Sequence, residues 1–376
     1  MDKIKVLSVF GTRPETIKMA PLVRELSVRS EFESLVCVTA QHRQMLDQVL
    51  NVFSIVPDYD LDIMTPGQTL SDITARVLKG LEKVIAEAKP DIVLVHGDTT
   101  TTFAGALAAF YSQTAIGHVE AGLRTYQKYS PYPEEANRQF VGCIADLHFA
   151  PTELSRQNLL GEGKNPDSII VTGNTAIDAM KMTVREDFDD EILRWANDSR
   201  LIVLTAHRRE NLGEPMRGMF RAIKRITDEH ADIKVVYPVH LNPVVRQAAD
   251  DILGDSDRVK LIEPLEVVEF HNLLSRSYMI LTDSGGIQEE APSLGKPVVV
   301  LRDTTERPEG IDAGTLKLAG TNENNIYSIV KKLVEDKEAY QRMSQAKNPY
   351  GDGHASRRIA DALTEYFLNP DESMIR

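Results

Sequence analysis

Cysteine is scarce in this sequence, with two among 376 residues. Cys37 lies in an apolar, strand-like segment and Cys143 in a helix-like segment, at a spacing typical of neither a disulfide framework nor a metal site. We therefore predict that both are buried, reduced thiols. Histidines and carboxylates show no familiar ligand spacing either, so we predict no bound metal.

Long apolar runs are missing as well, so no part of the chain is predicted to cross a bilayer. The segment after Met1 enters a strand-like run without the pattern of a signal peptide, which predicts a cytoplasmic protein that does not contact membranes. Basic residues are outnumbered, 43 to 56, and the net charge is −13. This balance argues against nucleic acid as a partner, although a local group of arginines and lysines is enough to bind a small anion.

Two cofactor motifs are also missing. The sequence contains no G-x-G-x-x-G after a strand and no G-x-x-x-x-G-K-[ST], so neither an NAD site nor a P-loop is predicted. We expect no cofactor.

Short apolar runs alternate with helical stretches along the chain, which is typical of parallel α/β sheets covered on both faces. The alternation breaks at Gly173-Asn174, so we predict two Rossmann-like domains whose parallel sheets face a central cleft. Residues 1–173 form the first, with a C-terminal helix at about 356–376 packing back, and residues 174–355 form the second. The predicted strands are Ile4–Phe10, Ser34–Thr39, Asp91–His96, Ala115–Val119, Leu147–Ala150, Ile169–Thr172, Leu201–Thr205, Ile233–Pro238, Val259–Ile262, Tyr278–Thr282 and Pro297–Leu301.

Charged side chains follow the strands of the first half, at the end where open parallel sheets bind ligands. Arg13 and Lys18 follow the first strand, and Asp98, Glu120 and Glu134 lie after later strands or at a helix start. Paired carboxylates with different pKa values are what acid–base catalysis needs. Simpler interpretations remain open: Glu134 could complement a helix dipole, Asp98 could cap a helix, and each cation could be a solvated surface charge.

In the second half, the turn Asp283-Ser284-Gly285-Gly286 joins a strand to a helix. Its glycines would leave backbone N–H groups open to an anion, although tight glycine turns without a ligand are also common. Glu290, one turn later, is placed for a diol such as ribose, and Pro292 predicts a short or kinked helix. His207 and Arg307 follow other strands and, with the two cations of the first half, would fit a diphosphate.

Segments in the same order along the chain resemble motifs of the bacterial non-hydrolysing UDP-N-acetylglucosamine 2-epimerases. The resemblance runs from Val6 to about Gly353, and the ordered set is far more specific than any one motif. It is carried by Gly11-Thr12-Arg13-Pro14-Glu15, Gln41-His42-Arg43, His96-Gly97-Asp98-Thr99, Val119-Glu120-Ala121-Gly122-Leu123-Arg124, Pro133-Glu134-Glu135, Asn137-Arg138, His207-Arg208-Arg209-Glu210 and Asp283-Ser284-Gly285-Gly286-Ile287-Gln288-Glu289-Glu290.

The resemblance implies a GT-B architecture that binds UDP and UDP-N-acetylglucosamine, and it implies roles for particular residues. The residues that it places against UDP are Arg13, Lys18, His207, Phe270 (near the uracil), Ser284, Gly285, Gly286, Glu290 and Arg307. Those that it places at the sugar in catalytic roles are Lys18, Asp98, Glu120, Glu134 and His207.

A second, activating site for UDP-N-acetylglucosamine is found in some of these enzymes. The residues that resemble it are Gln41, His42, Gln44, Arg208 and His240. Where some of those relatives have an arginine, this sequence has Pro66-Gly67-Gln68. Relatives are also commonly homodimers.

The reaction implied by the resemblance is reversible epimerisation at C2, by elimination of UDP to a bound 2-acetamidoglucal and re-addition. It would supply N-acetylmannosamine for cell-surface polysaccharide. The alternatives are a GT-B glycosyltransferase, a hydrolysing 2-epimerase, and a nucleotide-sugar sensor without turnover. The first-half carboxylates argue against a sensor, because binding a diphosphate does not require them.

Overall fold

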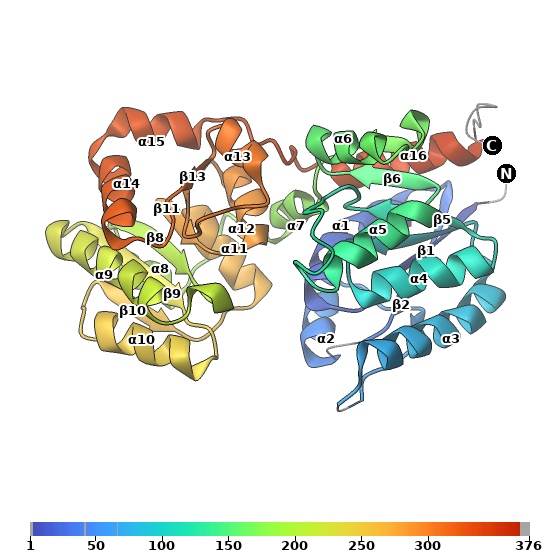
Figure 1. The fold of residues 1–376 in the computed structure, drawn as a ribbon, viewed down its shortest axis with the longest axis horizontal. Helices are drawn as coiled ribbons and strands as arrows, with labels where there is room; N and C mark the ends of the chain where they lie inside the picture. Colours follow the sequence, from blue (N-terminus) through green and yellow to red (C-terminus); the bar gives the residue numbers. More distant parts are fainter. Residues whose placement is uncertain (1–2, 41–42, 66, 369–376) are drawn as a thin grey trace. The chain divides into compact units, whose positions relative to one another are not determined.

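The computed structural model describes residues 3–40, 43–65 and 67–368 of the chain, without the side chains of residues 43–45 (Figure 1). The chain divides into two compact units. Unit 1 comprises Met1–Ala179 and Gly351–Arg376, and unit 2 comprises Met180–Tyr350. The chain therefore enters unit 2 within α7 (Thr175–Thr183) and returns to unit 1 between Tyr350 and Gly351.

Unit 1 is built on a parallel sheet in the order β3-β2-β1-β4-β5-β6-β7. The order reverses between β1 and β4, so the loops after these two strands leave the sheet in opposite directions. The strands are β1 (Ile4–Phe10), β2 (Phe32–Val38), β3 (Tyr59–Asp60), β4 (Ile92–His96), β5 (Ala115–Val119), β6 (Leu147–Ala150) and β7 (Ile169–Val171).

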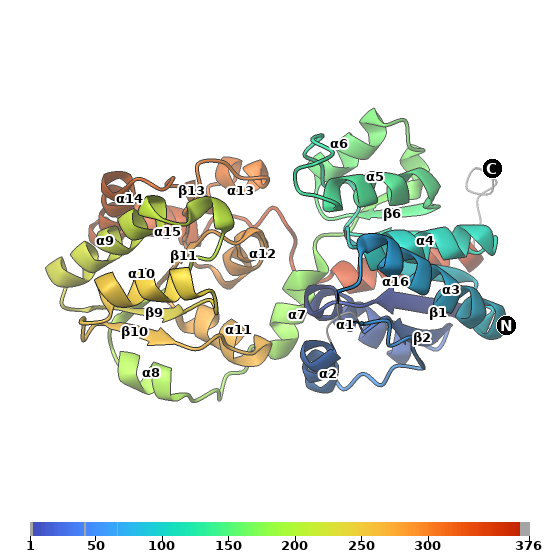
Figure 2. The ribbon, with the colours of Figure 1, turned by 60° about the horizontal axis from the view of Figure 1, so that its bottom comes forward.

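Helices cover both faces of this sheet (Figure 2), which is why its central strands are apolar on both sides. One face packs against α1 (Arg13–Val28), α2 (Arg43–Val52) and α16 (Ala355–Leu368). The other packs against α3 (Leu70–Ala88), α4 (Thr100–Tyr111) and α5 (Glu134–Ile144). Two shorter helices, α6 (Glu153–Gly161) and η1 (Pro166–Ser168), join β6 to β7.

Unit 2 repeats the same winding with the order β10-β9-β8-β11-β12-β13, again all parallel. Helices α9 and α10 with α14 cover one face of its sheet, and α8, α11 and α12 cover the other. The strands are β8 (Arg200–Thr205), β9 (Ile233–Pro238), β10 (Val259–Ile262), β11 (Met279–Thr282), β12 (Val298–Val300) and β13 (Leu316–Leu318). The helices are α8 (Glu191–Ala196), η2 (Arg209–Asn211), α9 (Glu214–Glu229), α10 (Pro243–Leu253), α11 (Val267–Arg276), α12 (Gly285–Glu290), η3 (Ala291–Leu294), α13 (Pro308–Asp312), α14 (Glu323–Glu335) and α15 (Lys337–Ser344).

Each unit is thus the Rossmann-like α/β layer structure predicted from the strand–helix alternation. The C-terminal helix α16 packs on α1, with Ile359 and Leu363 in the core of unit 1. As Pro292 predicted, α12 is short, and the chain continues as the 3-10 helix η3. Within the described part of the chain, no helix is both long and apolar enough to span a bilayer.

The prediction for the second cysteine was wrong. Cys37 is buried in β2, where burial raises the pKa of its thiol to about 12. Cys143 is exposed, because α5 turns Val141 and Gly142 toward the core and carries the next residue on its solvent face.

Candidate active-site residues in each unit

Several predicted site residues lie at the reversal points of the two sheets. In unit 1, the loop after β1 carries Arg13, at the first position of α1, and the loop after β4 carries Asp98. In unit 2, the loop after β8 carries His207 and the loop after β11 carries Ser284. Ligands of doubly wound sheets bind beyond the carboxyl ends of the strands at this point.

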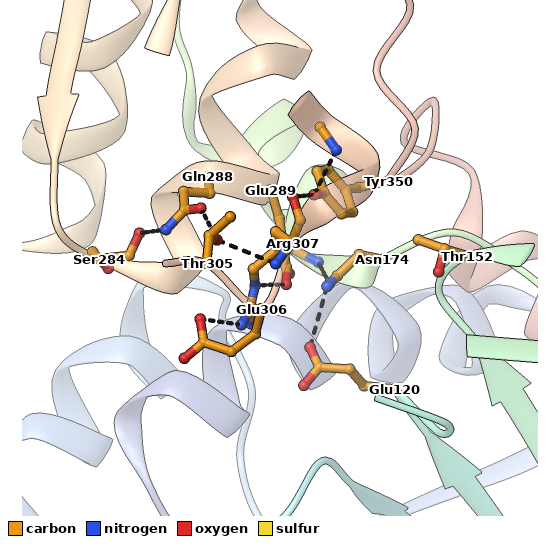
Figure 3. Close-up of polar contacts among 12 residues, drawn as sticks. Glu120, Thr152, Asn174, Ser284, Gln288, Glu289, Thr305, Glu306, Arg307 and Tyr350 are labelled. Carbon is orange, nitrogen blue, oxygen red and sulfur yellow. Dashed lines mark hydrogen bonds and ion pairs between the residues drawn. The ribbon is translucent and has the colours of Figure 1, made fainter. Parts of the chain in front are cut away.

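A buried network of alternating charge is the main feature of unit 1. Lys18 forms an ion pair with Oε2 of Glu120, whose Oε1 lies 3.3 Å from Nη2 of Arg138. The same Arg138 nitrogen pairs with Oδ2 of Asp98. Asn174 donates to Oε2 of Glu120 at 3.1 Å (Figure 3). Arg138 therefore joins two of the three predicted carboxylates, Asp98 and Glu120, which lie in different loops of the sequence.

Glu120 is held ionised in this network. Burial by itself would raise the pKa of Glu120, but Lys18 and Arg138 outweigh it and keep that pKa well below its usual value. Nε2 of His96 lies 3.8 Å from Oε2 of Glu120. Burial lowers the pKa of His96 to about 4, so this imidazole is neutral at physiological pH.

Glu134 differs from the other two carboxylates. It is the first residue of α5, four positions before Arg138, so both side chains lie on one face of the helix. Its Oε2 is buried and accepts no hydrogen bond from the residues that the structure describes. The simpler interpretation of Asp98 does not hold, because the residue that caps α4 is Thr99 and the Asp98 carboxylate pairs with Arg138.

Glu15 joins the two reversal-point loops of unit 1. Its Oε2 accepts from the backbone N–H groups of Gly11 and Thr12, at 3.2 and 2.8 Å, after β1. Its Oε1 accepts from the hydroxyl groups of Thr99 and Thr102, at 2.7 and 3.2 Å, after β4. Burial raises the pKa of Glu15, against the lowering effect of these hydrogen bonds.

In unit 2, Asp283 organises the two reversal-point loops in the same way. Its fully buried carboxylate accepts from the backbone N–H groups of His207 and Arg208, each at 2.9 Å, and from Nδ2 of Asn211 at 3.1 Å. Nδ1 of His207 lies 3.2 Å from Oδ1 of Asp283. Burial lowers the pKa of His207, although Asp283 opposes the shift.

The glycine turn of unit 2 lies next to Arg307, whose contacts with Glu289 and Thr305 are drawn in Figure 3. A Cβ added to Gly285 would lie 3.3 Å from Cζ and Nη1 of Arg307. Nε of Arg307 donates to Glu289 at 2.7 Å, and its carbonyl accepts from Tyr350 at 3.2 Å. Thr305 donates to Gln288 at 2.6 Å and accepts from the Arg307 N–H at 3.2 Å. The guanidinium is therefore fixed at the start of α12, beside the backbone N–H groups of the turn.

Glu290 and Phe270 lie on neighbouring elements of unit 2. Glu290 ends α12, with Oε2 3.9 Å from Nε2 of His271, and its side chain is largely buried. Phe270, the residue before that histidine on α11, packs partly buried against the core. Glu290 lies close to the glycine turn, since its Oε1 would be 3.6 Å from a Cβ added to Gly286. A carboxylate and an aromatic ring are the groups that a nucleoside needs for its ribose and its base.

The residues predicted for an activating site are described only in part. Gln41 and His42 lie outside the described residues, as does the side chain of Gln44. Arg208 donates from Nε to the carbonyl of Asp283 at 3.0 Å. His240 stacks on His207, with ring centroids 5.7 Å apart.

Several residues of these networks were not among the predicted site residues. Arg138 and Asn174 hold Glu120, and Glu289 holds Arg307. Arg138 lies in a recognised motif, four positions after Glu134 on a predicted helix, and that spacing could have identified it. Glu289 also lies in a recognised motif, next to Glu290, but no local pattern indicates that Asn174 contacts Glu120. Across the described part of the chain, no group of three or more metal-ligating side chains is placed to hold an ion.

Comparison with known proteins identifies the family of the chain. The model of the UDP-N-acetylglucosamine 2-epimerase family matches residues 24–364. The chain belongs to this family. It is 65% identical over 367 residues to the UDP-N-acetylglucosamine 2-epimerase of Bacillus subtilis, covering 98% of this chain and 97% of that one. The predicted family and enzyme class are confirmed.

Two solved structures cover nearly the whole chain. The structure of S. aureus MnaA with UDP has a TM-score of 0.90 and 57% identity, covering 98% of this chain and 97% of that one. The structure of the Neisseria meningitidis UDP-GlcNAc 2-epimerase bound to UDP-GlcNAc has a TM-score of 0.87 and 51% identity, covering 96% and 100%. These similarities confirm the predicted GT-B fold class of the UDP-N-acetylglucosamine 2-epimerase family.

Proposed function

We propose that this 2-epimerase is of the non-hydrolysing type and interconverts UDP-N-acetylglucosamine and UDP-N-acetylmannosamine through a bound 2-acetamidoglucal. The observation that carries the proposal is the unit 1 network, in which Lys18 and Arg138 form ion pairs with Glu120, Arg138 also pairs with Asp98, and one oxygen of Glu134 lacks a partner among the described residues. Binding a nucleotide needs no such set, whereas moving protons on a sugar does.

The position of the reacting proton explains the need for elimination. The C2 proton of an N-acetyl sugar has no adjacent carbonyl group to acidify it. If the C1–O bond to the diphosphate breaks first, its electron pair leaves with UDP and positive charge develops at C1. The C2–H electrons then form the C1=C2 bond of the glycal, and the proton passes to a carboxylate. In the reverse sense a proton is added to the opposite face of C2, and a diphosphate oxygen bonds to C1.

The proposed roles divide between the two units. In unit 2, Arg307, His207, the Ser284 hydroxyl and the backbone N–H groups of Gly285 and Gly286 bind the diphosphate, which carries more negative charge as it departs. Glu290 binds the ribose hydroxyl groups and Phe270 packs on the uracil. In unit 1, Arg13 and Lys18 are the cations that the resemblance assigns to UDP.

The carboxylates of unit 1 stabilise charge and transfer protons. Glu120 is held ionised by its cations, so it suits the stabilisation of positive charge at C1 and the placement of Lys18. Glu134 has an oxygen free of any described partner and Asp98 is partly exposed, so these two suit proton transfer on the two faces of C2. The product would enter cell-surface polysaccharide synthesis.

Incubating the purified protein with UDP-N-acetylglucosamine alone, in deuterated water, tests this function. We expect UDP-N-acetylmannosamine with one deuterium at C2, because the abstracted proton exchanges before it is returned. Free N-acetylmannosamine would instead identify a hydrolysing epimerase, and no change without an added acceptor would identify a glycosyltransferase or a sensor. A product fully protonated at C2 would exclude elimination by an exchanging base.

A further inference from the structure

The side chain of Asn174 joins the carboxylate network of unit 1 from a different element than the cations of that network. Asn174 is 2% exposed and directly precedes α7, the helix within which the chain leaves unit 1. Its Nδ2 donates to Oε2 of Glu120 at 3.1 Å (Figure 3). The ion-pair partners Lys18 and Arg138 come from α1 and α5. Asn174 therefore supplies a neutral donor to an oxygen that also contacts a cation.

The start of α7 fixes the direction of this amide. Oδ1 of Asn174 accepts from the backbone N–H of Ala176 at 2.9 Å, and its carbonyl accepts from the N–H of Ile177 at 3.1 Å. Asp190 makes the same contact, from a side-chain oxygen to the N–H two residues later, at the start of α8. Because Oδ1 is bound by the helix, Nδ2, on the other branch of the planar amide, is turned toward Glu120.

The backbone around Asn174 is held by contacts that do not involve Glu120. Gly351, where the chain returns to unit 1, packs against it, since a Cβ added to Gly351 would lie 3.4 Å from the backbone nitrogen of Asn174. Nη1 of Arg358, on α16, donates to the carbonyl of Thr172 at 3.0 Å. The position of the donor is thus set by the rest of unit 1 and does not depend on the carboxylate that it binds.

We propose that Asn174 is a positioning residue for the epimerisation, one that fixes the rotation of the Glu120 carboxylate. Lys18 carries a compact charge on a flexible stem, so it can pair with a carboxylate in many orientations. A hydrogen bond from a fixed donor instead needs a near-linear geometry. The amide therefore keeps Oε2 of Glu120 on the side of Lys18 and Oε1 on the side of Arg138. The inference rests on the proposed function, in which Glu120 stabilises charge at C1 and places Lys18.

Asn174→Asp separates positioning from helix capping. An aspartate keeps the oxygen that caps α7, as Asp190 does for α8, but it loses the donor and places a second carboxylate against Glu120. Two adjacent carboxylates favour binding one proton between them. Because Lys18 and Arg138 keep Glu120 ionised, the introduced group takes this proton as the pH falls and becomes a donor. We expect kcat to be about tenfold below the wild type at about pH 9, with the deficit shrinking toward about pH 6, while KM stays within about twofold.

Two further variants assign this pH dependence to the donor. Asn174→Ser keeps a capping oxygen but is too short to reach Glu120, so its kcat should be about tenfold lower by a factor that does not change with pH. Asn322→Asp makes the same exchange at the exposed cap of α14 and should match the wild type at every pH. His96 also lies beside Glu120, but its pKa of about 4 leaves it neutral throughout this range.

Steady-state epimerisation by the intact protein and its variants, each checked for folding by circular dichroism, decides the question. Wild-type kcat in Asn174→Asp over the whole range, or a deficit that is the same at every pH, would overturn the positioning role. Wild-type kcat in Asn174→Ser would overturn it as well. A wild type that does not epimerise UDP-N-acetylglucosamine would instead contradict the proposed function itself, so the two failures are distinguishable.

Discussion

Glu120 combines two unfavourable features in one residue. Its φ is +63°, a left-handed backbone conformation that residues other than glycine rarely adopt, and its carboxylate is buried. Such a conformation costs about 1–3 kcal/mol. Pairing with Lys18 and Arg138 compensates for the buried charge, and removing one partner of a buried pair is strongly destabilising. Strained residues of this kind cluster at active sites, which agrees with the proposed role.

Neutral isosteres test the three carboxylates one at a time. We expect Asp98→Asn, Glu120→Gln and Glu134→Gln each to lower kcat by about 100-fold or more while UDP binding persists, because each loses a charge or a proton-transfer group. Steady-state epimerisation and calorimetry with UDP measure the two effects. Glu87→Gln, an exposed change on α3, is the control. Near-normal kcat in all three variants would show that these carboxylates have structural and not catalytic roles.

Stability should depend on pH through His96. Its pKa is lowered by burial from 6.5 to about 4 in the folded state, so the unfolded chain binds more protons between these values. The free energy of unfolding must then fall as the pH falls from about 6.5 to about 4, by up to about 1.4 kcal/mol per pH unit from this residue. Glu120 remains ionised in this window, because its pKa lies well below its usual value.

Denaturant titrations from pH 7 to pH 4.5 measure this dependence. We expect His96→Gln to show a shallower loss of unfolding free energy than the wild type. His354 is exposed, so His354→Gln should keep the wild-type slope. Parallel curves for the wild type and His96→Gln would mean that His96 does not gain a proton on unfolding.

At the scale of elements, Glu15 holds the loops after β1 and β4 together by accepting four hydrogen bonds. All four partners donate, so the amide nitrogen of Glu15→Gln would face donors and at least one of them would lose its acceptor. We expect a loss of stability of about 1–3 kcal/mol, and about tenfold lower kcat, because the start of α1, which carries Lys18, and the loop that carries Asp98 would shift. Thermal unfolding and kinetics measure both. Glu153→Gln on α6 is the exposed control, and matching values in the two variants would contradict this role.

The glycine turn at α12 makes a prediction about nucleotide binding. A side chain on Gly285 would meet the Arg307 guanidinium at 3.3 Å and fill the approach to the backbone N–H groups. We expect Gly285→Val to weaken UDP binding at least about tenfold in calorimetry, with the fold retained. Gly161, at the end of α6, has open space where a Cβ would point, so Gly161→Val is the matched control. Wild-type UDP affinity in Gly285→Val would exclude this turn as the phosphate site.

Elements differed in how well the sequence predicted them. The strands β1, β5 and β9 were predicted to the residue, and β4, β8 and β11 to within one residue, because burial on both faces makes such strands continuous apolar runs. The edge strands β3 and β13 were missed, since two or three residues give no periodic signal. The site residues differed in the same way, between those that a local sequence pattern predicts and those that depend on packing. Loops after central strands identified Asp98 and Glu120, but their link through Arg138 depends on how α5 packs, which no local pattern records.

At the scale of the whole molecule, unit 1 carries an exposed aromatic patch that neither sheet explains. Phe110 and Tyr111 on α4 and Phe140 on the adjacent α5 are each more than half exposed. Phe140 also contacts Phe103, with ring centroids 5.4 Å apart. Contiguous exposed apolar surface of this kind is typical of protein–protein interfaces. It fits the homodimer implied by the resemblance, in which the same patch of two copies would meet.

Substituting charge into this patch tests the dimer. Phe140→Arg combined with Phe110→Asp should abolish association, because a charge buried against an apolar partner surface costs far more than the lost contact. Light scattering after size-exclusion chromatography should give twice the 42.0 kDa chain mass for the wild type and the single-chain mass for the double variant. Val56→Asp, an isolated exposed apolar position, should leave the wild-type mass unchanged. A wild type that elutes as a monomer, or a double variant that keeps the doubled mass, would remove this patch as the dimer interface and leave its exposed aromatic rings to be explained by another partner.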